Sequence, residues 1–426
     1  MGESNHLGRL VRSATDRFAV LRLRDLRLVF ASTLVSDLGD GAVTVALAFA
    51  VLDLTHSATD LGIVMAARMI AQVLVMLIGG VVADRVSRRA VMVSADLVRF
   101  VGQVSIGVLL LAGHATVVEI AGSQVLVGAG GSFFIPASSG LIQSVAGEHV
   151  QEANALRVVA SSSSGIIGPA IGGVLVVTIG ARWALIGDGA SYLASGLLLW
   201  RVSAAAVTGL SHDDNSSSFL ADLRDGFQEV AGRTWLWAMI VVMAIGNILM
   251  ASYPVLAPLI CKQRYGGAGA YALLTVLWSA GMLAGGISLL RFKPRFPLRS
   301  GVFAFCPATL PGITLALHAP IYVVGACQLL SGLGMTVLNT FWWTAMQENV
   351  PAASMSRVSS WDYAATLAIM PLGFALAGPL AGAIGVSAAL LATSVGALLV
   401  TLTALLVRDI RVLPSRASAE PQLAAT

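Results

Sequence analysis

The feature that most constrains this chain is a series of apolar runs, each just long enough to cross a lipid bilayer as a helix. A bilayer core about 30 Å thick requires roughly 20 apolar residues. Only 11% of the residues are charged, against about a quarter in soluble domains. The pattern predicts an all-α membrane protein with twelve transmembrane helices, near residues 28–52, 61–83, 91–112, 117–139, 157–180, 183–203, 234–260, 268–290, 299–317, 319–343, 359–383 and 385–407.

A polar stretch divides the twelve runs into two sets of six. We expect an N-terminal six-helix bundle over 28–203, a cytoplasmic connector over 204–233 and a C-terminal six-helix bundle over 234–407. Residues 1–27 and 408–426 then form cytoplasmic terminal segments. The first run begins near Leu28 and contains Asp37 and Asp40, so we interpret it as an uncleaved span rather than a signal peptide.

The basic residues indicate the orientation. With the amino terminus inside, the outer segments receive only Arg182, Lys262 and Arg264, and nearly all other Lys and Arg residues fall on inner segments. Short cytoplasmic loops carry such an excess. We therefore expect both termini to be cytoplasmic, in a cell inner membrane. The basic residues form no continuous stripe, which argues against nucleic acid as a partner.

Two internal matches suggest that the halves are repeats. Gln143, Arg157 and a Gly/Pro cluster precede or lie in the fifth span, and Gln347, Arg357 and Pro371 occupy the corresponding places at the eleventh. Gly-Gly pairs also end the second and eighth spans, each before basic residues. Repeats in register indicate duplication into two parallel halves.

The loop after the second span carries a recognisable motif, Gly80-Val81-Val82-Ala83-Asp84-Arg85-Val86-Ser87-Arg88-Arg89. It resembles the signature loop of the major facilitator superfamily, with Ser87 where a second glycine is usual. The resemblance implies that Gly80, Asp84, Arg85, Arg88 and Arg89 gate the cytoplasmic side. We expect Asp96 and Arg99, spaced i,i+3 in the third span, to pair locally and support this loop. The alternative is that the basic residues only set the orientation.

The fifth span contains a glycine–proline motif that resembles the one found in antiporters of this superfamily. Its members are Gly165, Gly168, Pro169, Gly172 and Gly173. The resemblance implies export, whereas the alternative interpretation is close packing between membrane helices.

Further motifs narrow the resemblance to drug:proton antiporters that include macrolide-efflux and enterobactin-export proteins. They include Leu38-Gly39-Asp40, Asp96-Leu97-Val98-Arg99 and Phe133-Phe134-Ile135-Pro136-Ala137. The arginine that other branches carry in the fourth span is absent, and Gln124 occupies that stretch.

Charges within the spans are candidates for proton coupling, since each costs at least about 2.5–3.5 kcal/mol near the bilayer centre. Asp40 and Asp37 share one face of the first span, and Arg68 in the second is the expected counter-charge. The alternative is a fixed ion pair between two helices. Asp188 and Asp362 are further candidates.

Aromatic residues of the second half suggest a substrate cavity that would hold an amphipathic molecule by burial and stacking. The candidates are Asn247, Tyr253, Trp278, Trp342 and Trp343. An interfacial aromatic belt is the alternative for the two adjacent tryptophans.

These features predict a secondary transporter that exports amphipathic small molecules by proton antiport with alternating access. We expect a monomer in the bilayer, with the small molecule and protons as partners, and no cofactor, metal or enzymatic activity, since no nucleotide-binding or nucleophile motif occurs. An uptake symporter or facilitator is the first alternative. A non-transporting receptor or scaffold that binds a partner through 204–233 is the second.

Overall fold

A computed structural model describes residues 22–83, 87–203 and 226–414. Within these ranges the chain is helical and contains no strand. By packing, it forms two compact units: the first unit holds residues 1–47 and 70–212, and the second unit holds 48–69 and 213–426. The predicted limits of the bundles and connector stay predictions.

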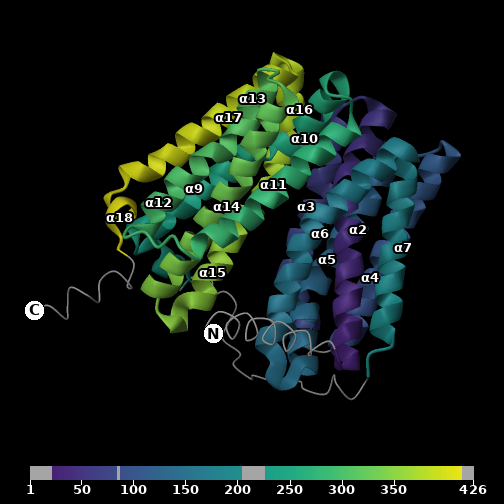
Figure 1. Cartoon of the computed structure of the whole chain (residues 1–426), viewed down its shortest axis with the longest axis horizontal. Helices are drawn as coiled ribbons and strands as arrows, with labels where there is room; N and C mark the ends of the chain where they lie inside the picture. The colour runs from purple at the N-terminus through teal and green to yellow at the C-terminus, as the bar shows by residue number, and fades with distance from the viewer. Residues whose placement is uncertain (1–21, 84–86, 204–225, 415–426) are drawn as a thin grey trace, which may run out of the picture. The chain divides into compact units, whose positions relative to one another are not determined.

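The first half of the chain provides six long helices and one short turn of 3₁₀ helix. They are α2 (Arg24–Thr55), α3 (Ala58–Ala83), α4 (Arg88–Ala112), α5 (Val117–Ala146), η2 (Gly147–His149), α6 (Val150–Thr178) and α7 (Ala181–Trp200). Residues 48–69, which end α2 and begin α3, pack with the second unit. In Figure 1, α2, α4 and α7 run side by side.

The second half is more interrupted. Its elements are α9 (Thr234–Met250), α10 (Ser252–Arg264), α11 (Ala268–Leu289), α12 (Pro297–Phe305), η4 (Cys306–Thr309), α13 (Leu310–Ala316), α14 (Ile321–Asn349), α15 (Ala352–Leu367), α16 (Met370–Ile384), α17 (Val386–Thr403), η5 (Ala404–Leu406) and α18 (Arg408–Val412).

Three predicted spans of the second half are broken helices, and prolines explain the breaks. Pro254 follows the break between α9 and α10, Pro307 lies in η4, and Pro371 follows the break between α15 and α16. Proline lacks the N–H that a continuous helix needs, and its ring clashes with the preceding turn. Apolar length therefore predicted helical structure over these three ranges but not its continuity.

Nine helical stretches of the described residues are long and apolar enough to cross a membrane. One of them, Val117–Thr178, joins α5 and α6 across η2. The total of twelve transmembrane helices and the cytoplasmic position of both termini stay predictions.

The core of the first unit lies around α4, which packs against α5 and α7. Ser87 caps α4, because its hydroxyl accepts a hydrogen bond from the Ala90 amide. Arg88 then donates to the Gly140 carbonyl on α5 at 2.7 Å, and Arg89 donates to the Val202 carbonyl after α7. The start of α4 is thus tied to both of its neighbours.

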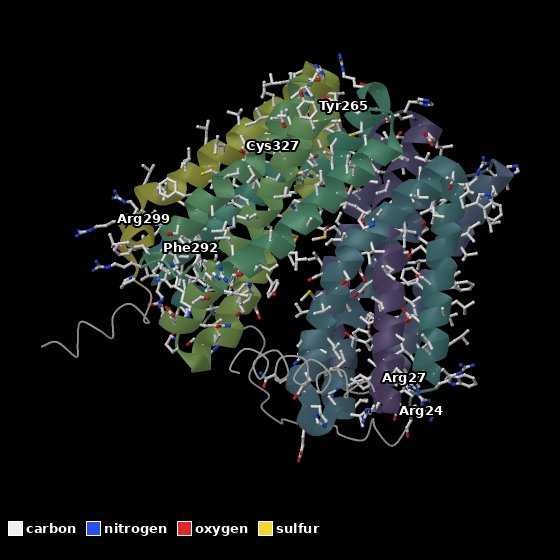
Figure 2. All side chains as sticks on the ribbon, viewed as in Figure 1. Arg24, Arg27, Tyr265, Phe292, Arg299 and Cys327 are labelled. Carbon is white, nitrogen blue, oxygen red and sulfur yellow. The ribbon has the colours of Figure 1, made fainter. Side chains whose placement is uncertain are left out.

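Cationic side chains cluster near helix ends. Figure 2 shows Arg24 and Arg27 at the start of α2, and Arg299 within α12 in the second unit. All three side chains are exposed. Exposed arginines at the ends of apolar helices fit lipid headgroups and water better than hydrocarbon.

Candidate functional site

A buried arginine is the centre of a polar cluster inside the first unit. Arg99 on α4 forms ion pairs with Asp40 on α2 and with Asp96 one turn away on its own helix, the latter at 3.3 Å. Its guanidinium also donates to the Ser36 hydroxyl at 3.1 Å. One cation is therefore shared by two carboxylates from two helices.

Helix α7 supplies a donor to each of these carboxylates. The Tyr192 hydroxyl donates to Asp40 at 2.8 Å, and the Ser195 hydroxyl donates to Asp96 at 2.5 Å. The Arg99 guanidinium also lies over the Tyr192 ring, 3.9 Å from its centre, a cation–π geometry. We call Asp40, Asp96, Arg99, Tyr192 and Ser195 the Arg99 cluster.

The two carboxylates differ in exposure. The Asp96 side chain is fully buried, whereas 29% of the Asp40 side chain is exposed. The Arg99 side chain is 5% exposed. Of the two acids, only Asp40 has part of its side chain open to its surroundings.

Glycines bring α2 close to its neighbours beside the cluster. An added side-chain carbon on Gly168 of α6 would lie 2.8 Å from the Gly41 Cα. Gly172 meets the Ala42 backbone in the same way, and Gly39 lies against Asp188 and Ser191 of α7. Small residues at both sides of the crossing permit this approach.

The predicted glycine–proline motif lies entirely in α6, and Pro169 is within the helix. Gly168 and Gly172 form the crossing with α2, and Gly173 is buried, while Gly165 is half-buried. These contacts fit the helix-packing interpretation of the motif. Its antiporter role stays a prediction.

Two of the other charges predicted for coupling, Asp37 and Asp188, interact electrostatically with members of the Arg99 cluster. Asp37 lies one turn before Asp40 and interacts electrostatically with Asp40, Arg99 and Arg157. Asp188 is 2% exposed and accepts from Ser191 at 3.4 Å. Arg68 belongs to the second unit, so its predicted pairing with Asp40 stays a prediction. The structure assigns Asp40 a partner that the sequence analysis did not expect, Arg99.

Asp362 lies apart from the cluster, on α15 of the second unit. It is 5% exposed and accepts a hydrogen bond from the Trp342 indole N–H at 3.2 Å. Its other carboxyl oxygen is buried and has no partner among the described residues.

The predicted gating loop is only partly described. Gly80 lies in the last turn of α3, which ends at Ala83. Arg88 and Arg89 form hydrogen bonds that join the start of α4 to its neighbours. Asp84 and Arg85 lie outside the described residues. The expected i,i+3 pair of Asp96 and Arg99 is present, and Arg99 also pairs with Asp40 on α2. A role of this pair in supporting the loop stays a prediction.

The predicted cavity residues have separate surroundings in the second unit. Trp342 is 1% exposed and packs edge-on against Trp235 in the core, which does not support its assignment to a substrate cavity. Trp343 stacks near Tyr363, and Trp278 is half-buried on α11.

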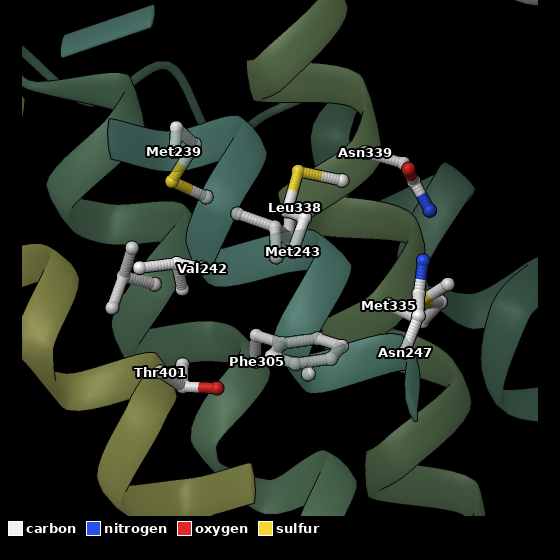
Figure 3. A pocket seen from close by; sticks show the side chains of 11 residues that line it. Met239, Val242, Met243, Asn247, Phe305, Met335, Leu338, Asn339 and Thr401 are labelled. Atoms are coloured by element: carbon white, nitrogen blue, oxygen red, sulfur yellow. The ribbon is translucent and has the colours of Figure 1, made fainter. Parts of the chain in front are cut away.

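The remaining two cavity residues lie on neighbouring helices. The Tyr253 hydroxyl is buried without a partner among the described residues. Asn247 lines a cavity between α9, α12, α14 and α17 (Figure 3).

Sequence reasoning missed Tyr192, Ser195 and Ser36, although a signal for two of them exists. Asp188, Tyr192 and Ser195 recur at i, i+4 and i+7 on α7, as Asp96, Arg99 and Gln103 do at i, i+3 and i+7 on α4. Three polar residues on one face of an apolar helix indicate a face turned towards protein. Gln103 extends the face by accepting from Gln124 of α5 at 3.1 Å.

The arrangement suits proton exchange better than covalent chemistry or metal binding. No group of three or more His, Cys, Asp or Glu side chains within the described ranges could hold a metal ion. Instead, the cluster contains one accessible acid, one buried acid and one permanent cation. A proton added at Asp40 would therefore change how Arg99 is shared.

Comparison with known proteins places the chain among transporters. It is 26% identical over 404 residues to the multidrug efflux pump Tap of Mycolicibacterium fortuitum, covering 91% of this chain and 96% of the relative. The fold is similar to that of the nucleoside transporter NupG, with a TM-score of 0.74 and 12% identity over 90% of this chain and 98% of that one.

A bacterial homologue of the iron transporter ferroportin, in its inward-facing state, has a TM-score of 0.70 at 17% identity, covering 90% of this chain and 98% of its own. At such identities the structural likeness concerns the fold alone. The sequence profile of the Major Facilitator Superfamily matches residues 29–370. The resemblance noted in the sequence is thus confirmed: this chain is a multi-pass membrane protein and belongs to the major facilitator superfamily.

Proposed function

We propose that this transporter exports amphipathic small molecules in exchange for protons, and that Asp40 of the Arg99 cluster carries the exchanged proton. The observation that supports this most is the sharing of one buried guanidinium between a buried and a partly exposed carboxylate. Membership of the superfamily establishes a membrane transporter, and the efflux direction is part of the proposal. The coupling ion and the substrate class are the parts proposed here.

The charge balance of the cluster favours a proton-binding role. With Asp40 and Asp96 both ionised, the cluster carries one more negative than positive charge. Two further acids, Asp37 and Asp188, interact electrostatically with Arg99, and Arg157 is a cation that interacts with Asp37. An excess charge in a low-dielectric surrounding is costly, so binding of one proton brings Asp40, Asp96 and Arg99 to neutrality.

Protonation of Asp40 weakens its ion pair with Arg99 and leaves Asp96 as the remaining anionic partner. The Asp40 contact joins α2 to α4, and the close crossing at Gly41 and Gly168 joins α2 to α6. In the proposed cycle, protonation therefore releases one of the contacts that hold α2. Alternating access requires two arrangements of similar free energy that protons and substrate populate differently.

The relatives and the α6 motif support export as the direction. The relative from M. fortuitum is named a multidrug efflux pump, and the glycine–proline motif resembles that of antiporters. Asp37, Asp188 and Asp362 stay secondary candidates for proton binding, and Arg68 a candidate counter-charge.

Transport in everted membrane vesicles tests the proposal. With the wild-type chain, we expect an imposed pH gradient to drive accumulation of a fluorescent amphipathic dye, and a protonophore to abolish it. Asp40→Asn should lose the gradient-driven accumulation while keeping exchange of dye down its own gradient. Asp60→Asn, which changes an acid in the first turn of α3, is the matched control.

Two results would contradict the proposal. Accumulation by the wild-type chain that is indifferent to a collapsed pH gradient would remove the proton coupling. Full gradient-driven transport by Asp40→Asn would remove Asp40 from the coupling step. Net transport into cells, measured in whole cells with the same dye, would instead favour an uptake symporter.

A further inference from the structure

Two stretches of the second unit carry a group of exposed cations. The first stretch, residues 290–299, joins α11 to α12 and includes the start of α12, and the second, residues 404–413, includes η5 and α18. Only one acid, Asp409, lies in the two stretches. Their six cationic side chains are all exposed: Arg291, Lys293, Arg295, Arg299, Arg408 and Arg411. We call these six side chains the basic patch.

The core of the second unit holds the two stretches together. Ile410 of α18 is fully buried and belongs to the same hydrophobic cluster as Leu298 and Val302 of α12. Helix α18 packs against α12, and Figure 1 shows them at the same end of the second unit. Figure 2 shows Phe292 and Arg299 near that end. The cations of both stretches therefore lie on one region of the surface.

One aromatic ring holds two of these cations. The Arg295 guanidinium carbon lies 5.4 Å from the centre of the Phe296 ring, and the Arg299 guanidinium carbon lies 5.0 Å from the same centre. A cation at such a distance is attracted by the face of the ring. Like charges repel each other, so two guanidinium groups on one ring are stabilised further when an anion binds to both.

The described part of the chain does not neutralise the basic patch. None of the six cations forms an ion pair with a described residue. Helix α12 starts among them with Pro297, and no side chain caps its amino terminus. Uncapped N–H groups at the start of a helix carry partial positive charge and favour an anion. The patch thus offers several positive groups to an anion from outside the protein.

Exposed apolar side chains border the basic patch. Leu290 is 77% exposed and Leu406 is 79% exposed. Phe292 is about half exposed and packs against Phe341 of α14, with 6.3 Å between the ring centres. Apolar side chains beside arginine and lysine are typical of segments at the boundary between acyl chains and headgroups. This border favours a membrane lipid over a free anion as the partner.

We propose that the basic patch binds an anionic phospholipid, with the phosphate held by Arg295 and Arg299 and the acyl chains against Leu290 and Phe292. Clusters of basic residues beside a transmembrane helix attract anionic lipids, and a guanidinium group can form two parallel hydrogen bonds to a phosphate. The inference depends neither on the exported molecule nor on the coupling ion. It gives these cations a role beyond setting the orientation of the chain.

Lipid binding to the purified full chain in detergent tests the proposal. The probe is phosphatidylglycerol, which is anionic, and the comparison lipid is phosphatidylcholine, which has no net charge. Native mass spectrometry measures the bound fraction of each lipid as its concentration is raised. We expect the wild-type chain to bind phosphatidylglycerol more tightly. Arg295→Gln/Arg299→Gln should weaken that binding on the order of ten-fold, since each basic residue adds to the attraction of an anionic lipid.

A variant that keeps every charge separates a specific site from general attraction. Phe296→Leu removes the ring that holds both guanidinium groups and should weaken phosphatidylglycerol binding about three-fold, although the net charge is unchanged. Arg24→Gln/Arg27→Gln is the matched control, because it removes two exposed cations at the start of α2. It should bind phosphatidylglycerol as the wild-type chain does. Melting temperatures of all variants show whether they fold.

Four results would overturn the proposal. They are equal binding of the two lipids by the wild-type chain, wild-type binding of phosphatidylglycerol by Arg295→Gln/Arg299→Gln, and wild-type binding by Phe296→Leu, which would mean that charge alone attracts the lipid. The fourth is displacement of phosphatidylglycerol by inorganic phosphate, which would identify a free anion as the ligand. A preference for phosphatidylglycerol that both variants weaken supports the site, whether or not transport depends on a pH gradient.

Discussion

The Arg99 guanidinium lies over the face of the Tyr192 ring, and the hydroxyl of the same ring donates to Asp40. Tyr192 therefore contacts both members of the Asp40–Arg99 ion pair, one through its π-face and one through its oxygen. A single side chain on α7 thus holds together charges that come from α2 and α4. These two roles of Tyr192 can be separated by substitution.

Tyr192→Phe keeps the ring under Arg99 and removes only the hydroxyl. We expect a loss of about 0.5–1.5 kcal/mol of stability, the typical contribution of one hydrogen bond. Tyr192→Leu removes the cation–π contact as well, which is worth about 2 kcal/mol when desolvated, and also leaves space. The melting temperature of the purified protein should thus fall further for Leu than for Phe. Equal melting temperatures for the two variants would argue against the cation–π contact.

Arg99 should not be replaceable by lysine. A guanidinium presents five donors in a rigid fork and can serve two carboxylates, whereas an ammonium is a single point charge on a flexible stem. We predict that Arg99→Lys reduces gradient-driven efflux at least ten-fold while the protein still folds. Arg99→Leu leaves two acids without their cation and should cost about 3–5 kcal/mol, measured by thermal unfolding. Wild-type efflux by the lysine variant would refute the shared-cation arrangement.

The sequence predicted where helices lie because apolar length is a local property. It predicted that Asp40 needs a counter-charge because burial of a charge is costly, but it selected Arg68. The choice depended on which helices adjoin α2, and a single sequence gives no direct information on neighbours. Arg99 was assigned to a local pair with Asp96 by its i,i+3 spacing, and that contact exists. The spacing could not show that the same guanidinium reaches α2.

Helix ends and breaks were less predictable than spans, also for physical reasons. The polar residues after 139 fall outside the apolar run, yet α5 continues to Ala146. Hydrophobicity indicates which residues lipid can surround. A helix continues past them wherever its backbone N–H and C=O groups still form hydrogen bonds. Of the residues that line the cavity between α9, α12, α14 and α17, the sequence analysis named only Asn247, because the lining residues come from four helices.

The crossing of α2 and α6 should not tolerate a side chain. Gly168→Ala would place a carbon 2.8 Å from the Gly41 Cα, where only backbone movement can relieve the clash. We expect a destabilisation of about 1–3 kcal/mol, as for overpacked cores, and reduced efflux. Gly122→Ala on α5, where the added carbon meets nothing, is the control. The melting temperature of Gly168→Ala should be several degrees below that of Gly122→Ala. Similar melting temperatures for the two variants would contradict the close crossing.

A carboxylate just before α9 should make stability depend on acid pH. Glu229 accepts a hydrogen bond from Arg233 and another from Ser354 at 3.0 Å. These two bonds, that to Arg233 first, hold the pKa of Glu229 below its ordinary value of 4.5. A lowered pKa in the folded state means that the ionised group stabilises the fold above pH 4.5, and that this contribution is lost as the pH falls through the folded-state pKa.

Glu229→Gln should therefore lower the melting temperature at pH 7 and leave it nearly unchanged at the lowest pH at which the protein stays folded. The effect at pH 7 should be small, since the side chain is 35% exposed and solvent screens such pairs. Ser354→Ala removes only the weaker of the two bonds. It should therefore lower the melting temperature at pH 7 by less than Glu229→Gln does. Melting curves of the three proteins from pH 3 to 7 measure both effects. If the melting temperatures of Glu229→Gln and of the wild-type chain differ by the same amount at every pH, these bonds do not depend on ionisation of Glu229.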